Sequence, residues 1–257
     1  MTRRPLWLWV CAIAAYAFLY APLAIVVAYS FNESRLNAQW TGFTLAWYGK
    51  LFHNETMLTA AWNSLLIGVT TSVAATVLGT MAGYAMFRFR TRFLPVLVLA
   101  PIAIPEILMG VSLLIFFVMI NLTLGIFSII LAHIAFCIGF VAIVVRSRLA
   151  GMDESLIEAA RDLGASPWQA FRLVTLPLIM PGVVAGALMA FTLSIDDFVI
   201  TFFTAGVGSS TLPLQIYTMV KISVTPEVNA ISTLLMLLTL LLILIASKLS
   251  PDALRGR

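Results

Sequence analysis

The stretch that decides the fold is SLIEAARDLGASPWQAFRLVTLP, residues 155–177, a polar segment between long apolar runs. Ser155 and Glu158 have capping-box spacing, so we predict an amphipathic helix that begins near Ser155. Gly164 suits the C-terminal cap of that helix. Ser166, directly followed by a proline, is typical of the start of the next helix. The stretch therefore predicts a helix, a glycine turn and a second helix.

The composition around this stretch is that of a membrane protein. Of the 257 residues, 61% are hydrophobic and 10% are charged, whereas soluble domains have about 25% charged residues. The net charge of +4 is spread along the chain, so no nucleic-acid partner is expected. Cys11 and Cys137 lie in apolar runs without metal-ligand spacing, which predicts neither a disulfide nor a zinc site.

Six apolar runs are each long enough to cross a hydrocarbon core of about 30 Å. They cover about 6–30, 60–86, 94–120, 124–145, 178–204 and 228–247. The first run could be a cleavable signal peptide, but its apolar part continues to Tyr29, so we favour an uncleaved span. Residues 31–59 predict an exposed loop with interfacial aromatics. We predict an all-α protein, one membrane domain over residues 1–257 with six transmembrane helices.

The distribution of Lys and Arg predicts the orientation of these helices. One side would hold twelve of the 15 basic residues: Arg3, Arg4, Arg88, Arg90, Arg92, Arg146, Arg148, Arg161, Arg172, Lys248, Arg255 and Arg257. The other side would hold only Arg35, Lys50 and Lys221. Both termini and residues 153–177 are therefore predicted to be cytoplasmic. Small residues at Gly79/Gly83 and Gly182/Gly186 predict close helix packing.

Motifs of enzymes acting alone are absent. The chain has no phosphate-binding P-loop, G-x-S-x-G elbow or H-E-x-x-H helix, so we predict no catalytic residue, metal site or bound cofactor. His133 lies in the fourth apolar run, where it could relay protons or contact substrate. We favour a histidine that hydrogen-bonds across helices. Transport or a scaffolding role remains.

Three carboxylates lie inside apolar runs, namely Glu106, Asp196 and Asp197. Each costs about 2.5–3.5 kcal/mol at the centre of a span, and no Lys or Arg lies deep in a run to offset that cost. The partner is expected to come from elsewhere: a cationic substrate, a cation on another subunit, or a proton. These residues are the candidates for a substrate pathway.

The two acidic positions differ in their sequence surroundings. Pro101 and Pro105 remove backbone donors before Glu106, which leaves free carbonyl oxygens near a carboxylate. This pattern predicts either a cation site near the bilayer midplane or a proline kink with a protonated glutamate. Asp196 and Asp197 point about 100° apart on a helix. They are therefore not expected to serve one small site together, and one of them could pair structurally.

The polar stretch resembles a known signature. The EAA motif of permease subunits of binding-protein-dependent ABC importers is matched by Glu158, Ala159, Ala160, Gly164, Leu176 and Pro177. Val174 departs from that pattern, which favours isoleucine, and Asn63-Ser64-Leu65 resembles another recurring element of the family. A narrower resemblance, to spermidine/putrescine permeases, lies in residues 29–32, 194–199, 212–214 and 226–230.

This resemblance implies a multi-pass subunit of a bacterial inner-membrane importer for polyamines. Its partners would be a second permease subunit, such as a paralogue, two ATP-binding cassette ATPases and a periplasmic polyamine-binding protein. ATP and Mg²⁺ would be bound by the ATPases, which would dock on residues 153–177. Alternatives are the same machine for another small solute, a proton-coupled secondary carrier, or a purely structural subunit. The carrier is disfavoured because no inverted repeat is evident.

Overall fold

The computed structural model describes residues 6–35, 39–89, 92–222 and 225–249. Within these residues the fold is helical, with a single isolated β-bridge between Asn32 and Phe43, and the predicted all-α class is confirmed. The elements are α1 (Leu6–Tyr29), α2 (Ala46–Phe52), α3 (Glu55–Arg88), α4 (Phe93–Ala103), α5 (Glu106–Met119), α6 (Ile126–Ala150), α7 (Ser155–Asp162), α8 (Pro167–Ala170), the π-helix η1 (Phe171–Thr175), α9 (Leu176–Asp196), α10 (Val199–Thr204), α11 (Leu212–Ile222) and α12 (Pro226–Leu249).

The chain divides into two compact units. The first comprises the residues up to Leu58 together with Gln215–Thr239, and the second comprises Thr59–Leu214 and the residues from Leu240 onward. Arg3, Arg4, Arg90, Arg255 and Arg257, which entered the predicted charge distribution, lie outside the described residues.

The first unit has a polar centre at Asn32, which is fully buried. Its Nδ2 donates to the backbone oxygen of Gln39 at 2.9 Å, and its Oδ1 accepts the amide of Thr41 at 3.1 Å. The indole of Trp47 donates to the backbone oxygen of Asn32 at 2.7 Å. The predicted loop with exposed aromatics is therefore correct for Trp40 but wrong for Trp47, because this indole has a buried hydrogen-bond partner.

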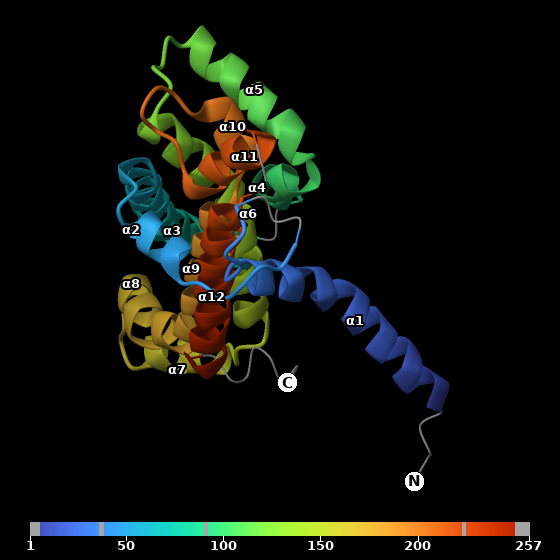
Figure 1. The fold of residues 1–257 in the computed structure, drawn as a ribbon. Helices are drawn as coiled ribbons and strands as arrows, with labels where there is room; N and C mark the ends of the chain where they lie inside the picture. The colour runs from blue at the N-terminus through green and yellow to red at the C-terminus, as the bar shows by residue number, and fades with distance from the viewer. Residues whose placement is uncertain (1–5, 36–38, 90–91, 223–224, 250–257) are drawn as a thin grey trace. The chain divides into compact units, whose positions relative to one another are not determined.

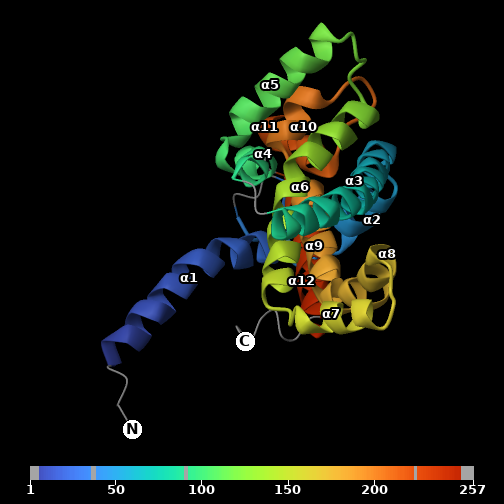
Figure 2. The same ribbon diagram turned by 180° about the vertical axis from the view of Figure 1, so that it is seen from behind.

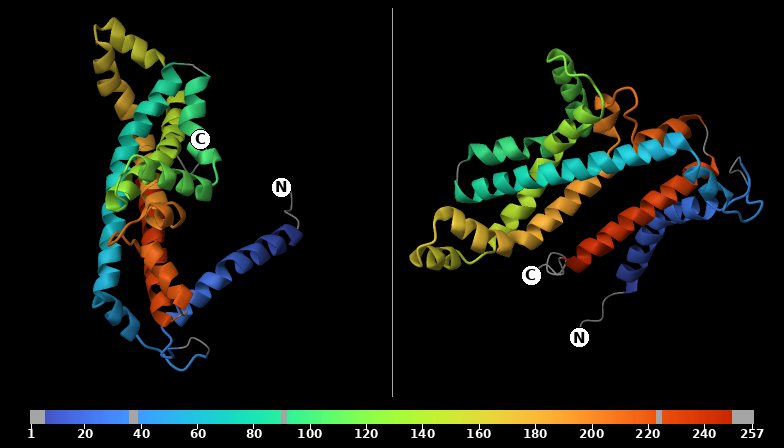
Figure 3. Two further views of the ribbon diagram at one scale, coloured as in Figure 1. Left: turned by 90° about the horizontal axis from the view of Figure 1, so that it is seen from above. Right: turned by 90° about the vertical axis from the view of Figure 1, so that its left-hand side faces the viewer.

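The second unit is built on three long helices, α3, α6 and α9, which Figures 1 and 3 show side by side. Its core includes Val141 and Val145 of α6 and Ile179 of α9. A Cβ added at Gly79 would lie 2.6 Å from Cβ of Val141 and 2.9 Å from a backbone oxygen of α6. Small residues thus let α3 approach α6 closely, as predicted. The short helices α7 and α8 lie at one end of this bundle, and α5 and α10 lie towards the other (Figures 1 and 2).

Four of the described helical segments are long and apolar enough to cross a membrane: Trp7–Tyr29, Glu55–Arg88, Ile126–Ala150 and Pro167–Asp196. A fifth is obtained if α4 and α5 count as one span. In α12, Pro226–Leu241 is an apolar segment below the length of such a span.

Two predicted spans are interrupted. The run 94–120 is a bent pair whose halves, α4 and α5, meet at 104°. Ile104 and Pro105 are extended there, because Pro105 has no amide hydrogen and its ring disfavours a helical residue before it. The run 178–204 is also not continuous, since α9 ends at Asp196 and α10 begins at Val199.

Candidate functional site

The two interrupted spans place their carboxylates at the breaks. Glu106 is the first residue of α5, directly after the proline break, and Asp196 is the last residue of α9. The helices beyond both breaks pack together, since a Cβ at Gly110 of α5 would lie 2.7 Å from the ring of Phe203 in α10. Each break thus carries one carboxylate, the two being 90 positions apart in sequence, and the helices that follow the two breaks are in contact.

Asp196 and Glu106 remain open, whereas Asp197 does not. Both Asp196 and Glu106 are exposed in the isolated chain, and no ion pair of either carboxylate is found among the described residues. The Asp197 side chain is only 5% exposed, and its Oδ2 lies 3.2 Å from Nε2 of His133 on α6. The neighbouring aspartates thus have different environments, as their 100° separation on a helix predicts.

The Asp197 carboxylate also closes the break between α9 and α10. Its Oδ1 accepts the amide of Ile200 at 3.3 Å, and its Oδ2 accepts the amide and the hydroxyl of Thr201 at 2.8 and 2.9 Å. These bonds satisfy first-turn amides of α10 that have no partner within the helix. A cationic substrate, a cation on another subunit or a proton was predicted as the partner of the carboxylates, with the alternative that one of the two aspartates pairs structurally. The alternative applies to Asp197. His133 and Thr201 supply the partners.

His133 is buried and hydrogen-bonded across helices, as predicted. Its Nδ1 lies 2.8 Å from Oγ of Ser194 on α9, and its Nε2 lies 3.0 Å from Oγ1 of Thr201 on α10. Neither Ser194 nor Thr201 was predicted to be a hydrogen-bond partner of His133 or Asp197, because they lie on different helices, on the two sides of a break that was not predicted.

Two aromatic residues that follow the aspartates in the sequence, Phe198 and Tyr217, have ring faces of the kind that can bind an ammonium group. Phe198 follows Asp197 in the break, and its ring lies 5.7 Å from that of Phe202. Tyr217 belongs to the first unit, where Nζ of Lys221 lies 6.0 Å from the centre of its ring. The Tyr217 face already has a cation of this chain near it.

The polar stretch 155–177 forms the predicted helix, turn and helix. Gly164 has φ of +89°, a left-handed conformation that favours glycine, and it directly follows the end of α7. Ser166 caps α8 as predicted, because its Oγ accepts the amide of Gln169 at 3.3 Å while the Gln169 side chain accepts the amide of Ser166 at 2.7 Å. Pro167 is the first residue of α8.

The predicted capping box at Ser155 and Glu158 is not formed. The cap position of α7 is Glu154, and no side-chain hydrogen bond is made there. Instead Oδ1 of Asp153 accepts the amide of Ser155 at 3.0 Å. The hydrogen bonds from Ser155 hold the pKa of the Asp153 carboxyl below its usual range. An aspartate side chain can accept a hydrogen bond from the backbone amide two residues later. Asp153 therefore takes the place at the start of α7 that was predicted for Ser155.

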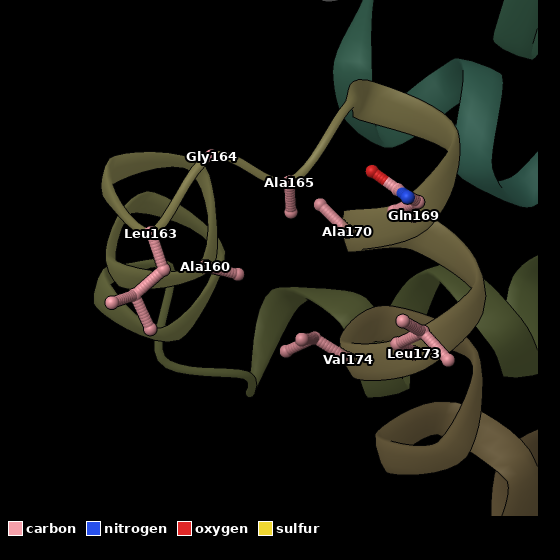
Figure 4. Close-up of a pocket in the computed structure, with 8 residues that line it drawn as sticks. All are labelled: Ala160, Leu163, Gly164, Ala165, Gln169, Ala170, Leu173 and Val174. Atoms are coloured by element: carbon pink, nitrogen blue, oxygen red, sulfur yellow. The ribbon is translucent and has the colours of Figure 1, made fainter.

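The amphipathic face predicted for α7 is open. Leu163 is 90% exposed, and Leu156 is also exposed. A cavity of about 350 Å³ separates α7 from α8 and η1, and Figure 4 shows Ala160 and Val174 pointing into it from opposite sides. Its lining comprises Ala160, Leu163, Gly164, Ala165, Gln169, Ala170, Leu173 and Val174. Residues 155–177 therefore enclose a mostly apolar cavity that is large enough to accept side chains of another molecule.

Of the other residues of the predicted signature, Glu158 lies on a different face of α7. It lines a second cavity, of about 570 Å³, together with Tyr84 and Arg88 of α3. Ala159 and Pro177 are exposed, and Leu176 is half-buried at the start of α9. Leu176 donates its amide to the oxygen of Phe171, five residues back, so the helix is widened into a π-turn before Pro177.

The geometry is thus that of broken membrane helices with open carboxylates, joined to an exposed helix pair at one end of the bundle. The sequence profile of the family described as "Binding-protein-dependent transport system inner membrane component" matches residues 75–255. The chain belongs to this family.

Curated members of this permease family are similar over almost the whole chain. The "Spermidine/putrescine transport system permease protein PotC" of Escherichia coli (strain K12) is 42% identical over 246 residues, 95% of this chain and 93% of that protein. The "Putrescine transport system permease protein PotI" of the same strain is 41% identical over 247 residues, 92% of this chain and 87% of that protein.

Solved structures of ABC transporters share the fold. A bacterial ABC transporter involved in the import of the acidic polysaccharide alginate has a chain that matches with a TM-score of 0.74 at 18% identity, over 95% of this chain and 96% of that one. The MetNI methionine ABC transporter, in an inward-facing conformation, matches with a TM-score of 0.65 at 23% identity, over 77% of this chain and 98% of that one. The all-helical fold is that of ABC importer permeases.

Proposed function

We propose that this permease translocates polyamines such as putrescine and spermidine into the bacterial cytoplasm, past Glu106 and Asp196. The observation that carries this proposal is that two exposed carboxylates lie at the breaks of two apolar helical segments, and that the helices after these breaks, α5 and α10, are in contact. Unpaired carboxylates at membrane depth are costly unless a cation meets them. A diamine or triamine supplies several ammonium groups on an extended chain. The relatives named for spermidine and putrescine support the same substrate class.

In this proposal Asp197 does not bind substrate, because its carboxylate is already bonded to His133 and Thr201. Its role is to fix the structure of the pathway wall. Asp196 and Glu106 contact the passing ammonium groups. The carbonyl oxygens of Leu97 and Pro101, for which Pro101 and Pro105 supply no amide donor, would add acceptors along the same wall. We expect the substrate to bind weakly and to move on, because a cation leaves a row of weak binding sites more readily than a single strong one.

Energy enters through residues 153–177. An amphipathic helix can bind with its apolar face in a groove of a partner protein. We expect α7 to bind in this way to a cytoplasmic ATPase, through the exposed Leu156 and Leu163 and the cavity beside Ala160. Glu158, Ala159, Ala160, Gly164, Leu176 and Pro177 would form or orient this docking element. Two ATPases bind ATP and Mg²⁺, and their closure rocks the helices between inward and outward access. This chain hydrolyses nothing itself and needs no cofactor.

The complete assembly would contain a second permease subunit, two ATPases and a periplasmic polyamine-binding protein. Residues 1–257 would act as one permease domain in the inner membrane with six spans, α4 and α5 sharing one and α12 forming the last. Both termini would be cytoplasmic, on the side of α7, as the basic residues favour.

The second candidate is the same machine for another small solute, because the alginate and methionine transporters share the fold with different substrates. The deciding experiment is uptake by the reconstituted complex from a panel of labelled putrescine, spermidine, an amino acid and a neutral sugar. Uptake of the two polyamines, blocked in Asp196→Asn and Glu106→Gln, supports the proposal. Uptake of another solute with no polyamine uptake contradicts it.

A further inference from the structure

We propose that His133 is a positioning residue, which holds the break between α9 and α10 so that Asp196 faces the substrate. The inference rests on the proposed function, since it assigns Asp196 its role. His133 lies on α6 and is 1% exposed, so it cannot itself meet a solute. It is nevertheless the one described histidine paired with a carboxylate, at 3.2 Å, and that carboxylate belongs to the residue next to Asp196.

The bonds of the imidazole span the break. On one side of it, Nδ1 meets Oγ of Ser194, in the last turn of α9. On the other side, Nε2 lies 3.2 Å from Oδ2 of Asp197, within the break, and 3.0 Å from Oγ1 of Thr201, in the first turn of α10. A neutral imidazole with its proton on Nε2 satisfies both sides at once, donating to the carboxylate and accepting from the serine. His133 of α6 therefore connects the end of α9 to the start of α10 across the two-residue break between them.

This fixation determines the direction of Asp196. Successive residues at a helix end point about 100° apart, so a carboxylate of Asp197 turned towards α6 turns that of Asp196 away from it. Asp196 is exposed while Asp197 and Ser194 are buried, in agreement with this arrangement. Without the imidazole, the Asp197 carboxylate would lose one buried hydrogen-bond donor, and the break could rotate to expose it in place of Asp196.

Packing alone does not account for the arrangement. A purely structural histidine would be equivalent to any buried polar tether between α6 and α10. The chain offers one: Oγ of Ser128 on α6 donates to the backbone oxygen of Thr204 in α10 at 2.8 Å, and Ser128 is fully buried. That tether joins the same two helices but does not touch either aspartate. Ser128→Ala is therefore a matched control.

The first measurement reports the direction of position 196 without any transport. In a Cys11→Ser, Cys137→Ala background, the thiol of Asp196→Cys is labelled by a water-soluble, positively charged thiol reagent in the assembled complex. His133→Leu is expected to slow this labelling about tenfold, the effect of losing one buried charged hydrogen bond. Ser128→Ala is expected to leave the labelling rate unchanged while lowering Tm.

The second measurement is putrescine uptake, with Asp196 intact. His133→Leu is expected to raise KM about tenfold, and His133→Gln, which keeps a donor near the Nε2 position, to recover part of the affinity. His133→Gln also serves if the leucine variant does not assemble. Unchanged labelling and KM in the His133 variants, or equal losses in Ser128→Ala, overturn the positioning role. If the unaltered complex takes up no polyamine while labelling still depends on His133, the substrate proposal fails and the positioning role stands.

Discussion

Asn63 on α3 donates a hydrogen bond from Nδ2 to the backbone oxygen of Ser210, 3.0 Å away and 147 positions later in the chain. The same Nδ2 donates to the oxygen of Gly208 at 3.2 Å, and the hydroxyl of Ser64 accepts the amide of Leu212 at 2.8 Å. The recurring Asn63-Ser64 element of the family therefore has a physical role in this chain. It holds the loop between α10 and α11 against the start of the second unit.

We expect Asn63→Ala to lower the stability of the purified protein by about 2 kcal/mol, because two part-buried hydrogen bonds to backbone carbonyl oxygens are lost. Thermal unfolding in detergent measures this as a lower Tm. Thr70→Ala is the control, since the Thr70 hydroxyl bonds only to carbonyl oxygens of its own helix. Equal melting of the two variants would show that the loop does not depend on Asn63.

Gly79→Ala is expected to destabilise the bundle by about 1–3 kcal/mol, because the new methyl group would overlap Val141 and a backbone oxygen of α6. The matched control is Gly49→Ala in α2, where nothing lies within 4 Å of an added Cβ. That variant should be neutral or slightly stabilising, since alanine favours a helix. A stable Gly79→Ala protein would contradict the close approach of α3 to α6.

Gly164→Ala is expected to impair ATP-driven uptake while the protein still inserts and keeps its Tm. The residue has φ of +89° and no neighbour within 4 Å, so the cost of about 1 kcal/mol is conformational and confined to the turn between α7 and α8. ATP hydrolysis and uptake by the reconstituted complex are measured together. Gly151→Ala, at the glycine that ends α6 just before α7 and has φ of −92°, should retain both activities. Full coupling in Gly164→Ala would argue against the docking role of the turn.

Asp196→Asn and Asp197→Asn are expected to fail in different ways. The first should lose polyamine uptake with an unchanged Tm, because Asp196 is exposed and makes no ion pair with a described residue. The second should also lower Tm by several degrees, because Asp197 is bonded to His133, Ile200 and Thr201. Uptake kinetics and thermal unfolding on the same preparations separate the two. Identical melting of both variants would contradict the different roles assigned to them.

The start of α7 is expected to fray in acid. The Asp153 carboxyl has a lowered pKa in the folded protein, so its stabilising bond to Ser155 is present at neutral pH and lost as pH falls through that lowered value. In protein labelled with ¹⁵N-serine, the Ser155 amide resonance should shift over this acidic range. Asp153→Ala should abolish the shift, and a shift that persists would assign the titration to another group.

The sequence by itself determined the helix, turn and helix of residues 155–177, because capping residues, a proline and a glycine act within a few positions of one another. It also determined which residues are apolar enough to lie in a membrane, since hydrocarbon thickness sets a length that can be counted. The helix before the turn was predicted with the wrong capping residue. Asp153 and Ser155 compete within one turn, and only the folded backbone decides between them.

The tertiary structure alone decided how the carboxylates are used. Sequence placed Asp196 and Asp197 side by side and predicted a partner from elsewhere, because no Lys or Arg lies deep in an apolar run. His133, 64 positions away from Asp197, instead reaches this aspartate through the packing of α6 against α9 and α10. It also decided that Glu106 and Asp196 both lie at helix breaks, because these depend on where the two apolar runs are interrupted. Local patterns set caps and periodicity, whereas pairing across helices depends on contacts that form only when the bundle folds.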